Sequence, residues 1–243
     1  MRIHNLLPLV LAWCFLSDAE ATSLIGAEVP PFVMHEANPL GPGLTAEILL
    51  VAAQRLGEPA QLEVKPFVRA LKMTAYGHDS LLVPPGRIPE REQQFRWVTP
   101  LVDEAFVLFT DRQRHPRPLQ QDELAGLTVG VMRDSVGEQL MKSFPGVHLE
   151  TAADEVINAK KLARGRIHAW AVSLNTGFYA QRVAGLDERQ LVRGAILSHV
   201  TLYLAASPDF PHSEMLRWQQ MIETMKQDGT LLQIKQRYHY VEP

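Results

Sequence analysis

The stretch LTVGVMRDSVGEQLMKSF, from Leu127 to Phe144, joins a strand pattern to a helix start. Its first six residues are mostly apolar and rich in valine, which predicts a buried strand. Ser135 then precedes Glu138 by three residues, the spacing of a capping box at a helix N-terminus. The stretch follows a polar connection that contains two prolines, residues 111–126. It therefore opens a second α/β unit partway along the chain.

Strand and helix patterns continue to alternate on the C-terminal side. Residues 151–165 form a predicted helix with Thr151 as N-cap and Gly165 as its end. Predicted strands flank this helix at residues 147–150 and 167–173. The predicted elements that follow are a strand from residue 200 and two helices, at 214–228 and 231–238.

The N-terminal side shows the same alternation. Residues 45–57 carry apolar side chains at helical spacing, with Thr45 as a candidate N-cap and Gly57 as the end. The other predicted elements on this side are strands at 60–67, 79–83 and 104–110 and a helix at 68–77. Such alternation predicts an α/β sheet.

The second α/β unit interrupts the first, which predicts two α/β lobes joined by two crossover strands. The crossovers are predicted at residues 107–113 and 200–206, with hinges near Thr110 and Thr201. The predicted lobes are residues 22–110 together with 200–243, and the inserted residues 111–199. A cleft between two lobes is a common place for a small ligand to bind.

Residues 1–21 have the pattern of a secretory signal peptide, with Arg2, an apolar run from Leu6 to Leu16 and a small-residue site that ends at Ala21. A buried N-terminal helix is the alternative. Cleavage would leave 243 − 21 = 222 residues and remove Cys14, the only cysteine, so we expect neither a disulfide nor thiol chemistry.

Several classes of function have no support in the composition or motifs. The formal net charge is −3 with both signs interspersed, so we expect no nucleic-acid partner. The histidines are scattered, and neither an H-E-x-x-H pair nor a phosphate-binding loop is present. We therefore expect no metal and no cofactor.

Seven segments taken in order carry a family resemblance. They are VPPF followed by GLTAEILLVAAQRLG, PFVRAL, PEREQQFRWVTPL, LAGLTVGVMRDSVGEQL, LARGRIHAWAVS and MKQDGTLLQIKQRY. Together they resemble the type II periplasmic solute-binding proteins, specifically family 3, which includes amino-acid receptors of ABC transporters. The resemblance covers nearly all of the mature chain. It implies a monomeric, non-enzymatic periplasmic binding protein that serves an ABC permease or a membrane sensor.

The resemblance also implies ligand-binding residues. Arg91 falls where the family places the arginine that grips the ligand carboxylate, and a guanidinium can meet a carboxylate with two charge-assisted hydrogen bonds. A surface ion pair with Glu90 or Glu92 is the alternative role. Ser135 falls where the family places a ligand-binding hydroxyl, and its alternative role is a plain N-cap.

Four further residues are weaker candidates for the ligand site. Phe67 could wall the ligand or pack in the core, and Arg69 lies two residues after it. Trp170 lies on a strand of the second lobe, where core packing is favoured over the cleft. Glu28 precedes the VPPF turn and could reach the cleft, although a solvated acid is the simpler interpretation.

The chain departs from the family at two places. The family carries serine or threonine in the loop that here contains Pro84 and Pro85, and proline has no N–H to donate. The family has an aspartate for the ligand ammonium where this chain has Ser173. The departures predict weak binding of standard amino acids and better binding of an acid that has no ammonium beside it.

Two other functions stay open at the level of sequence. Periplasmic cyclohexadienyl dehydratases resemble this fold and length, and such an enzyme needs a general acid such as Glu28, Glu90 or Asp134. An interaction module that has lost its ligand is the other alternative.

Overall fold

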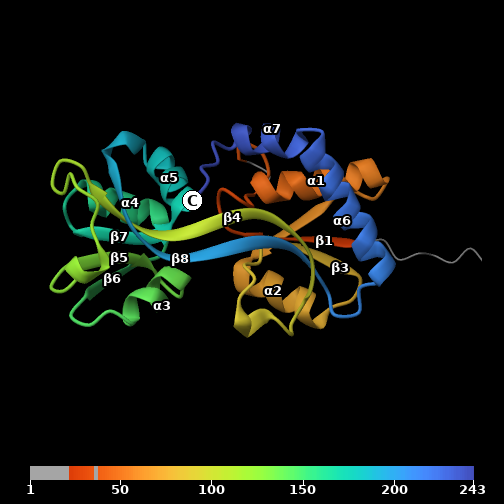
Figure 1. Cartoon of the computed structure of the whole chain (residues 1–243), viewed down its shortest axis with the longest axis horizontal. Coiled ribbons are helices and arrows are strands. Elements are labelled where there is room, and N and C mark those ends of the chain that lie inside the picture. Colours follow the sequence, from red (N-terminus) through yellow and green to blue (C-terminus); the bar gives the residue numbers. More distant parts are fainter. Residues whose placement is uncertain (1–21, 36–37) are drawn as a thin grey trace, which may run out of the picture.

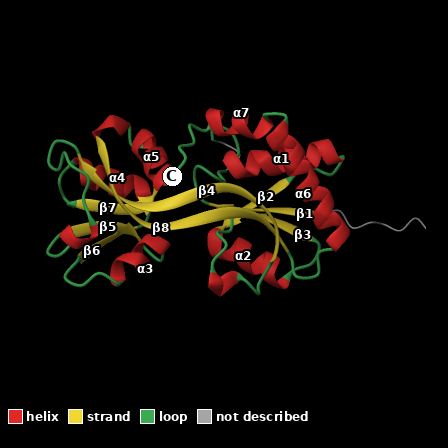
Figure 2. Ribbon diagram, viewed as in Figure 1, coloured by secondary structure: helices red, strands yellow, loops and turns green. Residues whose placement is uncertain are grey.

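Two long antiparallel strands, β4 (Arg96–Asp111) and β8 (Leu191–Ala206), run through the centre of the molecule (Figures 1 and 2). The computed structural model describes residues 22–35 and 38–243. The predicted signal peptide lies outside these residues. The two strands belong to one eight-stranded sheet with the order β2-β1-β3-β8-β4-β7-β5-β6. This arrangement is the predicted α/β fold with two lobes joined by two strands.

The first lobe is built on three parallel strands beside β8. These are β1 (Ser23–Glu28), β2 (Leu62–Pro66) and β3 (Ser80–Val83). One face of the sheet packs against three helices, and the other face packs against a single helix (Figure 1). The three helices are α1 (Leu44–Leu56), α6 (His212–Gln227) and α7 (Thr230–Arg237), and the single helix is α2 (Phe67–Tyr76).

The second lobe repeats this plan on the other half of β4. Its parallel strands are β5 (Thr128–Met132), β6 (His148–Ala152) and β7 (Ala169–Ser173). Its helices are α3 (Val136–Lys142), α4 (Glu155–Ala163) and α5 (Leu174–Val183). Val107 and Phe109 pack with α4 and α5, and Leu108 between them packs on the α3 side. This alternation along β4 is the period of a strand that is buried on both faces.

Two predicted helix starts were wrong. Thr45 lies inside α1, which begins after Gly43, and the Thr45 hydroxyl donates to the Phe32 carbonyl at 2.9 Å. Thr151 lies in β6 opposite Val131, so it belongs to the sheet. Asp154 caps α4 instead, because its carboxylate accepts from the Ile157 N–H at 2.9 Å.

The crossover on β4 differs from the predicted position near Thr110. Phe106 to Phe109 already pair with β7 of the second lobe, whereas Leu101 and Val102 pack in the core of the first. We therefore propose that β4 crosses between the lobes near Glu104. On β8 the partner of Glu104 is Val200, next to the predicted hinge at Thr201. The predicted lobe boundary at residue 110 stays a prediction. The pairing of Phe106 to Phe109 with β7 favours a boundary earlier on β4.

Among residues 22–35 and 38–243, no helix is long and apolar enough to cross a membrane. The same residues contain no group of three or more histidine, cysteine or acidic side chains placed to hold a metal ion.

Candidate functional site

The first lobe brings Arg91 and Phe67 together. Phe67 is the first residue of α2, where β2 ends, and Arg91 ends a short 3-10 turn, Pro89–Arg91, in the connection to β4. The guanidinium carbon lies 5.3 Å from the centre of the phenyl ring. One Nη of Arg91 donates to the Gly86 carbonyl at 3.3 Å. The aromatic ring therefore supports the guanidinium, and Gly86 takes the one hydrogen bond that this group makes within the described residues, so other N–H groups stay available.

Arg91 is partly buried and has no ion-pair partner among the described residues. Burial lowers the pKa of its guanidinium, and the negative charge of Glu90 opposes that shift. The predicted alternative was an ion pair with Glu90 or Glu92. Glu92 instead binds Arg87, with 2.5 Å between Nη2 and Oε1. A half-buried cation without a carboxylate is the arrangement that an anionic ligand would complete.

Gly86 adds a hydrogen-bond donor beside this arginine. It faces Leu202 in an isolated antiparallel bridge, flanked by hydrogen bonds from Arg87 N to Thr201 O at 3.2 Å and from Tyr203 N to Pro85 O at 3.0 Å. In such a non-hydrogen-bonded pair the N–H and C=O of Gly86 point away from β8. The carbonyl is the one that Arg91 binds, and the buried N–H has no partner within the described ranges.

The second lobe presents Ser135 at the start of α3. Its Oγ accepts from the Glu138 N–H at 3.1 Å, so the predicted N-cap exists. The Glu138 carboxylate reaches the Asp134 N–H at 2.7 Å, one residue earlier than in a standard capping box. The hydroxyl proton of Ser135 makes no hydrogen bond within the described chain, and it can still donate to a ligand.

Ser173 and Glu28 lie at the ends of β7 and β1, on opposite sides of one junction between the lobes. Ser173 Oγ contacts Thr176 Oγ1 at 2.9 Å, and the Thr176 hydroxyl donates to the Pro30 carbonyl at 3.0 Å. Glu28 pairs with His35, with 3.2 Å between Oε1 and Nε2. The Glu28 carboxylate and the Ser173 hydroxyl therefore both have partners within the protein. Ser173 stands where the family resemblance leads one to expect an aspartate, so this position carries no negative charge.

Two predicted site residues lie elsewhere. Trp170 is 0% exposed in the core of the second lobe, where its Nε1–H donates to Glu155 at 2.8 Å and its ring packs on Phe109. It has no surface through which to touch a ligand. Arg69 is exposed on α2 and makes no hydrogen bond or ion pair within the described chain.

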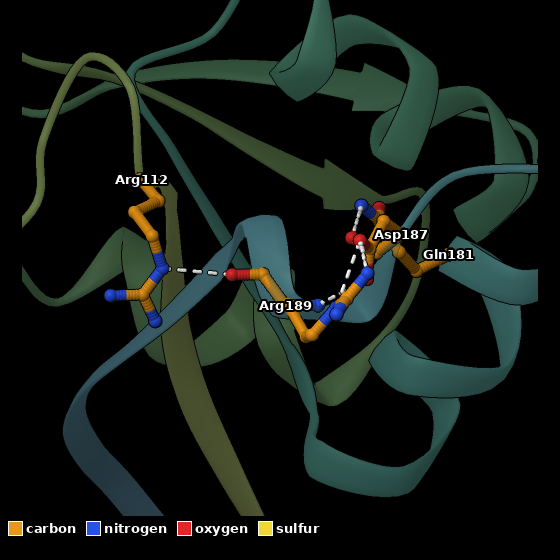
Figure 3. Close-up of polar contacts among 4 residues, drawn as sticks. All are labelled: Arg112, Gln181, Asp187 and Arg189. Carbon is orange, nitrogen blue, oxygen red and sulfur yellow. Dashed lines mark hydrogen bonds and ion pairs between the residues drawn. The ribbon is translucent and has the colours of Figure 1, made fainter.

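Other arginines show what a structural role looks like. In Figure 3 the Arg112 side chain donates to the Arg189 carbonyl at 2.8 Å, and the Arg189 guanidinium binds the Asp187 carboxylate, with 2.7 Å between Nη2 and Oδ2. Gln181 donates to the Asp187 carbonyl at 3.1 Å and ties α5 to the same turn. Arg189 has a carboxylate partner and Arg112 has two carbonyl acceptors, whereas Arg91 has one carbonyl acceptor, Gly86, and no carboxylate partner among the described residues.

The sequence did not point to the cavity at the hinge strands. This cavity, of about 310 Å³, is lined by Arg87, Asp103, Glu104, His199, Val200, Thr201 and Tyr203. The Val200 side chain also lies next to Gly86, because a Cβ placed on Gly86 would be 2.7 Å from Val200 Cγ2 and 4.0 Å from Arg91 Nη1. The cavity therefore adjoins the Arg91 site. Burial raises the pKa of Glu104 to about 7, although both of its oxygens accept N–H hydrogen bonds. The only sequence signal was an acid in an apolar strand.

Comparisons with known proteins support the fold. The structure resembles the GluR0 ligand-binding core in complex with L-glutamate, at 15% identity and a TM-score of 0.75, over 91% of this chain and 99% of that one. It also resembles a mutant of ArgBP from T. maritima, at 19% identity and a TM-score of 0.70, over 89% and 94% of the two chains.

A third similar structure is the ancestral amino acid-binding protein AncCDT-1, a precursor of cyclohexadienyl dehydratase. It shares 18% identity at a TM-score of 0.70, over 89% of this chain and 95% of that one. No protein-family profile and no curated protein matches the sequence. At these identities the likeness establishes the fold, which is the two-lobed type II fold of periplasmic binding proteins.

Proposed function

We propose that this protein is a periplasmic solute-binding protein of the family 3 type that closes its lobes on a small anionic solute. The observation that carries the proposal is Arg91, a partly buried guanidinium that rests on Phe67 and lacks a carboxylate partner among the described residues. The free Gly86 N–H beside it offers a second donor to the same anion. Guanidinium and amide N–H donors together are a common way to hold a carboxylate.

The opposite lobe would close the site. Ser135 stands at the N-terminus of a helix, and Ser173 ends the neighbouring strand β7. The Ser135 hydroxyl proton can donate to a ligand, whereas the Ser173 hydroxyl already donates to Thr176 Oγ1, and neither side chain carries a negative charge. Glu28, the candidate carboxylate at the same junction, is paired with His35, so an ammonium group has no dedicated counter-ion here. A free acid, or an acid whose amine is absent or distant, fits these groups better than an α-amino acid. Delivery to an ABC permease or to a membrane sensor follows from the family resemblance.

Calorimetry against a panel of small acids and the twenty amino acids tests this function. Arg91→Ala should weaken binding of the best acid by about 2–5 kcal/mol, the cost of truncating one partner of a buried charged pair. Arg69→Ala, on the exposed face of α2, is the matched control and should leave affinity unchanged. Equal affinity in the wild type and Arg91→Ala would return Arg91 to a structural role.

A dehydratase is less well supported by the site. Glu90 and Asp134 are exposed, and Glu28 is paired with His35. The buried Glu104 lines the cavity, but N–H donors occupy both of its oxygens, so it is not free to pass a proton to a substrate. Incubation with prephenate or arogenate tests the alternative, because product formation would establish an enzyme.

A further inference from the structure

The C-terminal residues of the chain reach from the first lobe to the second. Helix α7 packs in the core of the first lobe through Leu231 and Ile234. After this helix the chain turns toward α5, and Figure 1 shows the C-terminal end between α5 and α7. Tyr240 rests on the first lobe, where its ring lies 4.7 Å from Lys235 Nζ and its hydroxyl donates to the Asp103 carbonyl.

Asn175, the second residue of α5, receives this tail. The Val241 N–H donates to Asn175 Oδ1 at 2.8 Å, and Asn175 Nδ2 donates to the Val241 carbonyl at 3.0 Å. A single side-chain amide thus pairs with one residue of the tail as a neighbouring strand would. Asn175 as a whole residue is only 3% exposed, so water does not compete freely for these two hydrogen bonds.

Glu104 fixes the orientation of that amide. Its Oε2 accepts from both Asn175 N at 3.2 Å and Asn175 Nδ2 at 3.1 Å, and its Oε1 accepts from Leu174 N at 3.1 Å. Because the carboxylate takes one hydrogen of the Nδ2 group, the other hydrogen and Oδ1 face Val241. The carboxylate stands on β4 at the proposed crossover, so strand, helix and tail meet at one buried point.

We propose that residues 240–241 are a strap, a connection between the lobes beside β4 and β8, and that Asn175 is the residue that fastens it and holds the lobes closed. The strap would act with two other contacts of α5 to the first lobe. These are the hydrogen bond from Thr176 to the Pro30 carbonyl and the one from Asn38 Nδ2 to Tyr179 OH at 2.8 Å. All three contacts lie on one helix, which moves with the second lobe.

The inference rests on the hinged clamp of the proposed function but not on any ligand, so it is tested on the ligand-free protein. Val241→Pro removes the N–H that binds Asn175 Oδ1 and leaves the carbonyl. Val241→Ala keeps both backbone groups and is the matched control. A second variant ends the chain at His239 and removes the strap altogether.

Spin labels on introduced cysteines report the lobe arrangement, with Lys72→Cys on α2 and Gln139→Cys on α3, both at exposed positions. The expected result is a shift toward longer and more dispersed label distances in Val241→Pro and in the shortened chain, with Val241→Ala unchanged. Circular dichroism confirms that each variant is folded. An unchanged distance distribution in the folded shortened chain would overturn the strap, whether or not any solute binds.

Discussion

The guanidinium carbon of Arg91 lies over the Phe67 ring, 5.3 Å from the ring centre, so the aromatic ring limits how the cation can move. Phe67 also packs beside the small core under α2. Phe67→Leu keeps an apolar side chain there but removes the cation–π contact. We expect the affinity for the best acid to fall by about 1 kcal/mol, the typical scale of a partly exposed cation–π interaction.

Phe67→Tyr is the control for this prediction, because it preserves the aromatic face. Calorimetry measures affinity, and urea unfolding separates a loss of stability from a loss of binding. The prediction fails if Phe67→Leu and the wild type bind equally well.

A substitution of Ser135 can separate its effect on stability from its effect on binding. Aspartate is as good an N-cap as serine, so Ser135→Asp should keep the free energy of unfolding within about 0.5 kcal/mol. The same substitution places a negative charge beside the proposed anion and should weaken acid binding at least tenfold. Asp154→Ser makes a comparable cap exchange on α4, which carries no candidate ligand residue, and should leave binding unchanged. Tight acid binding by Ser135→Asp would remove Ser135 from the site.

Glu155 predicts a pH dependence of stability. Burial raises its pKa to about 7 from 4.5, while hydrogen bonds from Asn158 and Trp170 to Oε2 oppose the shift. The native state therefore holds this proton more tightly than the unfolded state. The stabilisation is fully present below pH 4.5 and is lost as the pH rises through about 7.

Glu155→Gln mimics the protonated acid, so the variant should lose less stability than the wild type as the pH rises. We expect similar stability to the wild type near pH 5 and greater stability at pH 8, by an amount on the order of 3 kcal/mol. Chemical unfolding at the two pH values measures this difference. Glu223→Gln, at an exposed position on α6, should follow the wild-type curve. A Glu155→Gln curve that parallels the wild type would contradict the prediction.

Long periodic elements could be predicted from the sequence, whereas contacts across the lobes could not. The two-lobed fold could be predicted from the order of strands and helices, because the spacing of apolar residues in each segment fitted either a strand or a helix. Helix α5 escaped notice because Asn175, Thr176 and Gly177 are poor helix formers. The structure explains the glycine, since a Cβ there would lie 2.6 Å from a ring carbon of Phe109. Tertiary packing, rather than local propensity, makes this helix.

The candidate site divides in the same way. Phe67 stands at a helix start, whereas Arg91 was singled out by the family resemblance and not by its local pattern. The structure brings the two together, and their contact with a ligand stays a prediction. The core position of Trp170 agrees with the role that the sequence favoured. The cavity beside Glu104 instead depends on how β4 pairs with β7 and β8, including several shifts of register. No local pattern encodes those shifts, and the crossover that we propose near Glu104 lies earlier on β4 than the position predicted from the sequence.

The absence of an aspartate at Ser173 leads to the last prediction. An α-amino acid buried in the cleft needs an anion for its ammonium, since an unpaired buried charge costs several kcal/mol. Ser173 ends β7, next to the junction that Thr176 and Pro30 form, and its hydroxyl carries no charge. Ser173→Asp would supply the carboxylate at that junction. We expect it to improve the affinity for at least one standard amino acid tenfold or more, about 1.4 kcal/mol.

Ser173→Asn has nearly the same shape as Ser173→Asp without the charge and should give no such gain. Calorimetry of the three proteins against the twenty amino acids measures both effects. Tight binding of a standard amino acid by the wild type, or equal gains in the two variants, would show that Ser173 does not decide which solutes the cleft accepts.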